Sequence, residues 1–166
     1  VNEFSDFARM PKPLIKSNNI YEVINENINL LNKIDPSIEI NLINHLNKGS
    51  KVNFDFEQFN RLFFNLIKNS IESIQEKVEK GNKIDKNIDI EIRERRDYII
   101  INILDTGTGF KNKKTKDLIK PYFTTKEKGT GLGLSIVDKI ISDHNGSINF
   151  INQNNGAKIQ IIIPNK

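Results

Sequence analysis

The sequence predicts an α/β fold of the α+β type, a two-layer sandwich in which helices cover one face of a mixed sheet. The first observation is composition: 166 residues with 37% hydrophobic and 28% charged side chains suit one soluble globular domain. The second is the order of periodic segments, which runs helix, strand, helix, two strands, long polar loop, helix, two strands. The third is that no apolar run approaches the roughly 18 to 20 residues of a membrane helix.

The chain is expected to begin with the end of a helix that belongs to something upstream. Apolar residues at helical spacing over 1–8 stop at Met10-Pro11-Lys12-Pro13, because proline ends a helix. The first residue is Val1 rather than Met, which suggests a piece of a longer protein. We therefore assign residues 1–13 to a helix tail and residues 18–166 to one domain.

Two amphipathic helices are predicted in the first half of the domain, at 20–34 and 56–78. The apolar side of the longer one holds Phe59, Leu62, Phe63, Leu66, Ile67, Ile71, Ile74 and Val78. Alternating patterns predict strands at 38–42, 88–92 and 98–104, and the last two form a hairpin through the polar turn 93–97.

The second half begins with a long polar loop without periodicity, from Asp105 to Gly131. A loop of that length in a compact domain is usually functional or disordered. A helix over 132–144 ends at Asn145-Gly146, and strands at 147–151 and 158–163 flank a turn at 154–156.

The basic excess of the chain lies in this loop. Residues 110–130 contain seven lysines and two acidic residues, a charge of +5, whereas the remaining 18 basic and 19 acidic residues give −1, for the total of +4. Such a local excess favours a small anionic partner over a nucleic acid, which is usually met by a broader basic face. A solvated, charge-rich loop is the simpler alternative.

Zero cysteines and two histidines exclude thiolate metal sites, disulfides, a cysteine nucleophile and a centre built from several histidines. A polar stripe on the long helix is the first candidate site; it holds Arg61, Asn65, Lys68, Asn69, Glu72 and Glu76. Any surface helix has such a stripe, but two asparagines one turn apart are unusual in a helix interior. The carboxamide oxygen of Asn69 could ligate Mg²⁺, which takes its other ligands from phosphates and water.

Two glycine-rich segments are the other candidates. Asp105-Thr-Gly-Thr-Gly109 follows an apolar strand, where a carboxylate can accept a hydrogen bond from an exocyclic amine such as that of adenine. Alone, this pattern also fits a plain turn. Residues 129–135, Gly-Thr-Gly-Leu-Gly-Leu-Ser, open a helix whose N-terminus could bind phosphate, although the P-loop and Rossmann patterns are absent. Together with the lysine-rich loop, these features describe a pocket for Mg²⁺–ATP.

These segments also resemble the motifs of a known family. Residues 65–72 resemble the N box of sensor histidine kinases, and residues 105–109, 121–126 and 129–137 are similar to their G1, F and G2 boxes. The resemblance implies the Bergerat ATP-binding fold, with three helices on one face of a mixed, mostly antiparallel sheet and an ATP lid over about 106–131. Residues 1–13 resemble the end of the second dimerisation helix of nitrogen-regulation kinases.

The resemblance implies a role for each matching residue. Asn69 would hold Mg²⁺, Asn65 and Lys68 would act beside the phosphates as the catalytic pair, and Asp105 would bind the adenine amine. The residues expected to contact ATP are Asn65, Lys68, Asn69, Asp105, Gly107, Gly109, Phe110, Phe123, Thr124, Thr125, Lys126, Gly129, Thr130, Gly131, Leu132, Gly133 and Leu134. Two positions depart from the family: Ala157 lacks a hydroxyl expected near adenine, and Thr106 replaces the usual Asn.

The expected chemistry is transfer of the γ-phosphoryl group of ATP to a histidine and then to a response regulator. Neither His45 nor His144 has the sequence context of the family's acceptor, so the acceptor is expected on a dimerisation domain outside this chain. The parent would be a homodimer anchored in the bacterial inner membrane, and this piece a cytoplasmic monomer without membrane or nucleic-acid contacts. The alternative is a nucleotide-dependent conformational or interaction module without kinase activity, although Asn65 stands where the switch ATPases of this fold use a glutamate.

Overall fold

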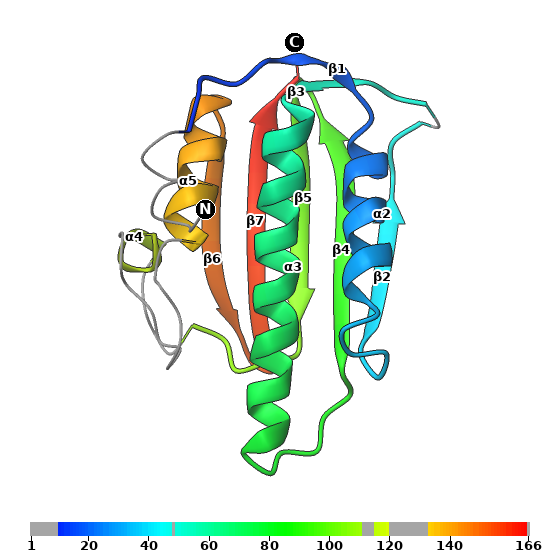
Figure 1. Cartoon of the computed structure of the whole chain (residues 1–166), viewed down its shortest axis with the longest axis vertical. Coiled ribbons are helices and arrows are strands. Elements are labelled where there is room, and N and C mark those ends of the chain that lie inside the picture. The colour runs from blue at the N-terminus through cyan, green and yellow to red at the C-terminus, as the bar shows by residue number, and fades with distance from the viewer. Residues whose placement is uncertain (1–9, 48, 111–114, 120–132, 166) are drawn as a thin grey trace.

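The computed structural model describes residues 10–47, 49–110, 115–119 and 133–165. Three helices lie side by side on one face of a five-stranded sheet (Figure 1): α2 (Ile20–Leu31), α3 (Phe56–Glu79) and α5 (Gly133–Asp143). The strand order is β2 (Glu39–Asn44), β4 (Asn87–Arg95), β5 (Tyr98–Asp105), β7 (Gly156–Pro164) and β6 (Ser147–Gln153). Only the β2–β4 pair is parallel within this sheet. The expected two-layer sandwich is therefore confirmed.

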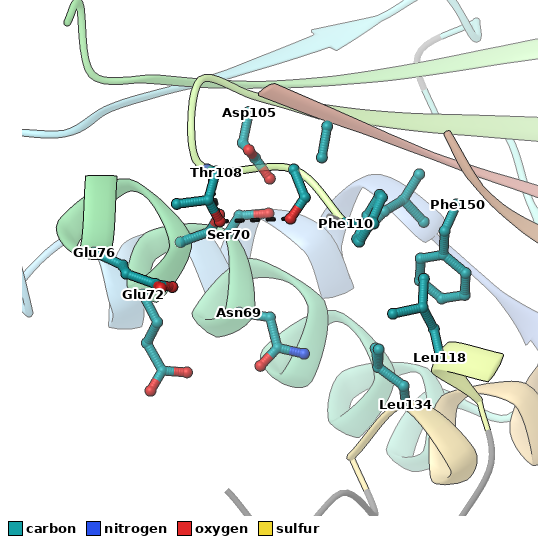
Figure 2. Close-up of a pocket in the computed structure, with 14 residues that line it drawn as sticks. Asn69, Ser70, Glu72, Glu76, Asp105, Thr108, Phe110, Leu118, Leu134 and Phe150 are labelled. Atoms are coloured by element: carbon teal, nitrogen blue, oxygen red, sulfur yellow. Dashed lines mark hydrogen bonds between the residues drawn. The ribbon is translucent and has the colours of Figure 1, made fainter. Parts of the chain in front are cut away.

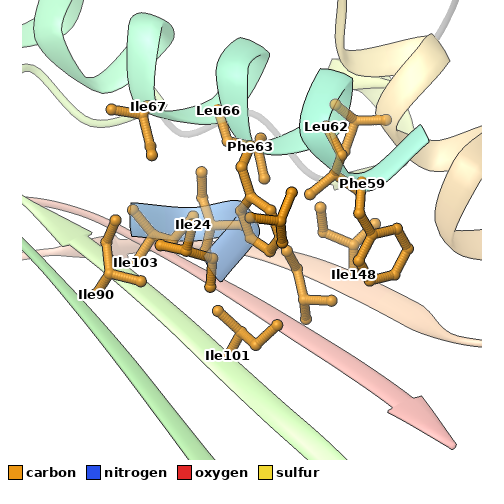
Figure 3. Packing of buried hydrophobic residues seen from close by; sticks show 14 of the residues in the cluster. Ile24, Phe59, Leu62, Phe63, Leu66, Ile67, Ile90, Ile101, Ile103 and Ile148 are labelled. Atoms are coloured by element: carbon orange, nitrogen blue, oxygen red, sulfur yellow. The ribbon is translucent and has the colours of Figure 1, made fainter. Parts of the chain in front are cut away.

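The core lies between the helices and the sheet because both present one apolar face. Phe59, Phe63 and Ile67 of α3 point toward the strands, where Ile90 and Ile101 are also fully buried (Figure 3). On β4 and β5 every second residue is buried, which matches the period of two expected for strands with one covered face. This packing holds the carboxyl end of β5 beneath α3.

Both longer helices of the first half begin at a side-chain cap. Asn19 accepts hydrogen bonds from the backbone N–H groups of Tyr21 and Glu22 at the start of α2. Asp55 accepts one from Gln58 N–H at 3.0 Å at the start of α3. These caps set where each helix begins, and for α3 this determines which residues face the sheet.

The structure differs from the sequence expectations at a few places. A two-stranded sheet of β1 (Lys16–Asn18) and β3 (Val52–Phe54) was not expected, because three-residue strands are too short for a periodic signal. A short helix, α4 (Thr115–Leu118), lies inside the stretch expected to be a loop. The first helix ends at Leu31, three residues earlier than expected, in a turn stabilised by the Ile34 N–H to Leu31 carbonyl bond.

Val78 was expected on the buried side of α3 and is 40% exposed. The last turns of α3 extend past the ends of the strands (Figure 1), so no strand lies beneath them. Within the described ranges, no helix combines the length and the apolar character needed to cross a membrane.

Candidate nucleotide site

A cavity of about 440 Å³ lies between α3 and the ends of β5, β6 and β7 (Figure 2). Its walls mix polar groups from α3 with apolar side chains from the sheet, as expected of a small-molecule site. It is lined by Asn69, Ser70, Glu72, Ser73, Glu76, Asp105, Thr108, Gly109, Phe110, Leu118, Leu134, Phe150, Ala157 and Ile159.

Asp105 is the buried carboxylate of this cavity. It is the last residue of β5 and only 8% exposed. Burial raises the pKa of its carboxyl above the ordinary value of 3.8, and the backbone N–H of Gly107, the Ser70 hydroxyl and the Ala157 backbone act in the opposite direction. A buried acceptor group in the cavity wall suits a ligand that brings its own N–H donor.

The loop after Asp105 is attached to α3 through Ser73. The Ser73 hydroxyl accepts the Thr108 backbone N–H at 2.9 Å and lies 3.0 Å from the Thr108 hydroxyl. Thr106, which departs from the family pattern, also has a structural partner, because its hydroxyl accepts the Asn87 N–H at 3.1 Å. The start of the loop is thus bonded to β4 through Asn87 and to α3 through Ser73.

Gly107 lies against α3 with no room for a side chain. A Cβ at this position would be 2.3 Å from Ser73 Oγ and 2.8 Å from the Ser73 carbonyl carbon. Gly109 has a positive φ of 78°, which glycine adopts without strain. The two glycines predicted from the sequence therefore allow the loop to approach the helix closely and then turn.

Some residues of the polar stripe of α3 line the cavity, and others lie outside its lining. Asn69 lines the cavity, together with Glu72 and Glu76 from the same stripe. Asn65 lies at the edge, where its Nδ2 donates to the Arg61 carbonyl and its Oδ1 would be 3.6 Å from a Cβ on Gly133. Lys68 is exposed, with its ammonium 5.8 Å from the centre of the Phe64 ring. The stripe therefore runs from the cavity toward the start of α5.

The other end of the cavity is apolar. Phe110 and Phe150 form an edge-to-face pair with ring centres 5.4 Å apart, and Leu118 and Leu134 lie nearby (Figure 2). Phe110 N–H donates to Asn152 Oδ1 at 2.7 Å, which attaches this end of the loop to β6. A flat, weakly polar ring would find suitable contacts on this wall.

Five of the predicted site residues line the cavity together: Asn69, Asp105, Gly109, Phe110 and Leu134. The cavity lining does not include Gly107, Asn65, Lys68 or Gly133. The predictions for Phe123, Thr124, Thr125, Lys126, Gly129, Thr130, Gly131 and Leu132 lie outside the described residues.

Ser70 and Ser73 line the cavity, although neither was among the predicted site residues. They are small polar residues three positions apart on α3, so a helical wheel places them on one side. Serine is common on helix surfaces, and only the position of β5 beneath α3 brings these two next to Asp105 and its loop. The sequence signal was therefore present but not specific.

The two histidines have ordinary structural surroundings. His45 is exposed, with Nε2 3.2 Å from a Glu91 carboxylate oxygen. His144 is buried at the end of α5, where Nδ1 donates to the Ile140 carbonyl at 2.7 Å and Nε2 accepts the Asp55 N–H at 3.0 Å. Neither lines the cavity.

The chain is similar in sequence to known proteins. Residues 54–166 match the model of the family described as histidine kinase-, DNA gyrase B- and HSP90-like ATPase. The chain is 34% identical over 165 residues to the nitrogen regulation protein NtrY of Azorhizobium caulinodans, covering 98% of this chain and 21% of that protein. It therefore spans about a fifth of this relative's length.

Solved structures resemble the chain as well. The catalytic domain of histidine kinase ThkA, in a nucleotide-free form, superposes with a TM-score of 0.77 at 28% identity, covering 91% of this chain and 95% of that one. ThkA in complex with the response regulator protein TrrA gives a TM-score of 0.73 at 24% identity, covering 92% and 42%.

Proposed function

Because the chain belongs to the histidine kinase-, DNA gyrase B- and HSP90-like ATPase family, we propose that it binds Mg²⁺–ATP and serves as the catalytic domain of a sensor histidine kinase. In this proposal the γ-phosphoryl group passes to a histidine on a dimerisation domain outside these 166 residues and then to an aspartate of a response regulator. The observation that carries the proposal is the buried Asp105 carboxylate in the wall of a cavity of about 440 Å³.

The adenine end of the proposed site is built from Asp105 and the aromatic pair. The carboxylate accepts a hydrogen bond from the exocyclic amine, and Phe110 and Phe150 supply an apolar surface for the ring. Gly107 and Gly109 let the backbone pass close enough to leave space for it. Burial makes this pairing selective, because an unpaired carboxylate in a dry wall is unfavourable.

The phosphate end lies along the α3 stripe toward the start of α5. The donor set fits Mg²⁺, which prefers oxygen ligands and keeps waters and phosphate oxygens, since Asn69 offers a carboxamide oxygen at the cavity wall. Bound there, the ion would neutralise phosphate charge. Asn65 and Lys68, which lie on α3 outside the cavity lining, would act on the phosphates together with the lysine-rich lid over about 106–131.

The role of these residues in transfer is mainly positional. A neutral imidazole on the acceptor is already nucleophilic, so this chain needs to hold the phosphoryl group in line with it and to exclude water. The dimerisation domain would supply the acceptor histidine, and the response regulator would supply the final aspartate. This division of labour suits a site whose described lining residues include no histidine.

The partners and location are part of the same proposal. ThkA has been solved with the response regulator TrrA, which supports a response regulator as the downstream partner of this chain too. Residues 1–13 would be the tail of the second dimerisation helix; Pro11 and Leu14 are hydrogen-bonded to Gln58 and Asp55 at the start of α3. The parent would be a membrane-anchored homodimer with this domain in the cytoplasm, and the isolated chain a monomer.

Calorimetric titration of ATP, with and without Mg²⁺, tests the binding half of the proposal. We expect Mg²⁺-assisted binding by the wild type and its loss in Asp105→Asn, with circular dichroism as the control for folding. Absence of binding by the folded wild type would overturn the proposal.

Incubation of the chain with Mg²⁺, radiolabelled ATP and a purified dimerisation domain of an NtrY-type kinase tests the transfer half. Label on the acceptor histidine is expected, and no label with a His→Ala acceptor. Binding of ATP without transfer to any acceptor would favour the alternative, a nucleotide-dependent interaction module.

A further inference from the structure

The segment through which the chain enters the domain, residues 10–15, has no regular secondary structure and is bonded to the start of α3. The backbone N–H of Leu14 donates to Asp55 Oδ2 at 2.7 Å. The Pro11 carbonyl accepts from Gln58 Nε2 at 3.0 Å. Asp55 and Gln58 therefore hold this entering segment at two points, although they lie 41 and 47 positions further along the chain.

The Asp55 carboxylate takes the place of a strand partner for Leu14. The entering segment leads into β1, and the register of the β1–β3 pair, if continued, would place Leu14 opposite Phe56. Phe56 is the first residue of α3, so its backbone is helical rather than extended. Asp55 supplies the acceptor instead: its Oδ2 accepts the Leu14 N–H, and its Oδ1 caps α3. Each oxygen of this carboxylate thus has a separate partner.

Gln58 is an unexpected residue at a buried helix position. It is 8% exposed, and its Oε1 is buried without a hydrogen-bond partner among the described residues. An unpaired buried amide oxygen is unfavourable, and a methionine of similar size would avoid the penalty. A polar residue that lowers stability where an apolar one would not indicates a role other than stability. The bond from its Nε2 to Pro11 supplies that role.

These contacts lie far from the nucleotide cavity. Asn69, the first residue of α3 in the cavity lining, follows Asp55 by about 20 Å along the helix. In Figure 1 the entering segment crosses the end of the molecule at which α3 begins, whereas β5 ends with Asp105 at the other end. Asp55 and Gln58 therefore do not touch the nucleotide, and they can act only on what the entering segment is joined to.

We propose that Asp55 and Gln58 are positioning residues for phosphoryl transfer, which fix the direction in which the dimerisation domain joins the catalytic domain. This inference rests on the proposed function, in which residues 1–13 come from the end of the second dimerisation helix. Transfer requires the acceptor imidazole and the γ-phosphate to meet in a narrow range of positions, and a loose joint makes that arrangement rarer. Two hydrogen bonds at the start of α3 restrict the joint.

Amide hydrogen exchange in the 166-residue chain tests whether Asp55 holds the entering segment. The Leu14 N–H, followed by NMR, should exchange about tenfold faster in Asp55→Asn than in the wild type. Asparagine caps a helix as well as aspartate does, but it has one acceptor oxygen, so the bond to Leu14 is lost when the cap is kept. Asp89→Asn is the matched control, because the Asp89 carboxylate accepts from Asn41 on the sheet. It should leave Leu14 exchange unchanged.

Gln58→Met separates positioning from stability. We expect this variant to melt no lower than the wild type, because it removes a buried oxygen without a partner. Its affinity for ATP in calorimetry should also equal that of the wild type, and the same holds for Asp55→Asn, since neither side chain lines the cavity. A Gln58 with a purely structural role would instead lower the melting temperature when replaced.

The deciding test uses the parent protein with its own dimerisation domain attached. Labelling of the acceptor histidine by ATP should be about tenfold slower in the Asp55→Asn, Gln58→Met double variant, with an unchanged KM for ATP. The 166-residue chain with the same two changes should label a separate dimerisation domain at the wild-type rate, because no segment then joins the two parts.

Wild-type labelling by the double variant of the parent, or equal slowing toward a separate domain, would overturn the positioning role while ATP binding upheld the proposed function. Unchanged Leu14 exchange in Asp55→Asn would also overturn it. No ATP binding by the folded wild type would overturn both, because the positioning role rests on the proposed function.

Discussion

The backbone N–H of Asp55 donates a hydrogen bond to Nε2 of His144 at 3.0 Å, joining the first residue before α3 to the end of α5. The two residues are 89 positions apart in the chain. The Asp55 side chain also caps α3 through Gln58 N–H and accepts the Leu14 N–H at 2.7 Å. Through these three hydrogen bonds, Asp55 connects the segment at Leu14, the start of α3 and the end of α5.

Replacing His144 should destabilise the fold. His144→Ala removes the acceptor for the Asp55 N–H, the donor to the Ile140 carbonyl and a ring packed 4.5 Å from the centre of Phe59. We expect the free energy of unfolding to fall by about 2 to 4 kcal/mol, measured by urea denaturation. His45→Ala is the matched control, because His45 is 49% exposed and its loss should change stability by about 0.5 kcal/mol or less. Similar values for the two variants would contradict the structural role of His144.

Asp105→Asn should stabilise the protein while it abolishes nucleotide binding. Because burial raises the folded-state pKa of Asp105, the folded protein binds more protons than the unfolded chain, and its stability falls as pH rises through the two values. Replacing the carboxyl by a neutral amide removes this loss. At neutral pH we expect a gain of about 0.5 to 2 kcal/mol in thermal unfolding experiments.

The pH dependence provides the control for that prediction. At about pH 3, below both pKa values, the Asp105 carboxyl is protonated in both states, so the gain should disappear. A stability difference that stays constant from about pH 3 to pH 7 would show that ionisation of Asp105 is not its cause.

Gly107→Ala should destabilise the loop after β5. The added Cβ would lie 2.8 Å from the Ser73 carbonyl carbon, so α3 and the loop must separate. We expect a loss of about 1 to 3 kcal/mol in the free energy of unfolding. Gly133→Ala is the control, since its Cβ would meet its nearest neighbour, Asn65 Oδ1, at 3.6 Å. Adding Ser73→Ala should rescue only part of the loss, because the backbone contact remains.

Asn69→Ala should remove the Mg²⁺-assisted part of ATP binding. We expect affinity to fall by about tenfold, or about 1.4 kcal/mol, when Mg²⁺ is present, and to be unchanged in the presence of a chelator. Isothermal calorimetry with and without the chelator measures both values. Asn82→Ala, an exposed asparagine beyond the end of α3, should bind like the wild type. An equal loss with and without Mg²⁺ would contradict a role for Asn69 at the metal.

The helices, the main strands and the motifs can be predicted from local sequence patterns. Apolar residues at helical spacing over 56–78 predict α3 because one face of that helix must be buried, and alternation at 88–92 and 98–104 predicts β4 and β5. The place of Asp105 after an apolar strand made it a candidate, and in the structure it lines the cavity. These patterns are local, so each can be recognised within one segment without knowing which other segments pack against it.

Which residues become neighbours could not be predicted from these local patterns, because it depends on how the elements pack. The three-residue strands β1 and β3 exist because they pair with each other across more than thirty residues, and neither is long enough to show a period. Val78 is exposed because the sheet ends before α3 does. Ser70 acquires its place beside Asp105, and His144 its bond to Asp55, through the packing of helices on the sheet. Spacing along a chain specifies the face of an element, whereas the neighbours of that face depend on how all the elements pack together.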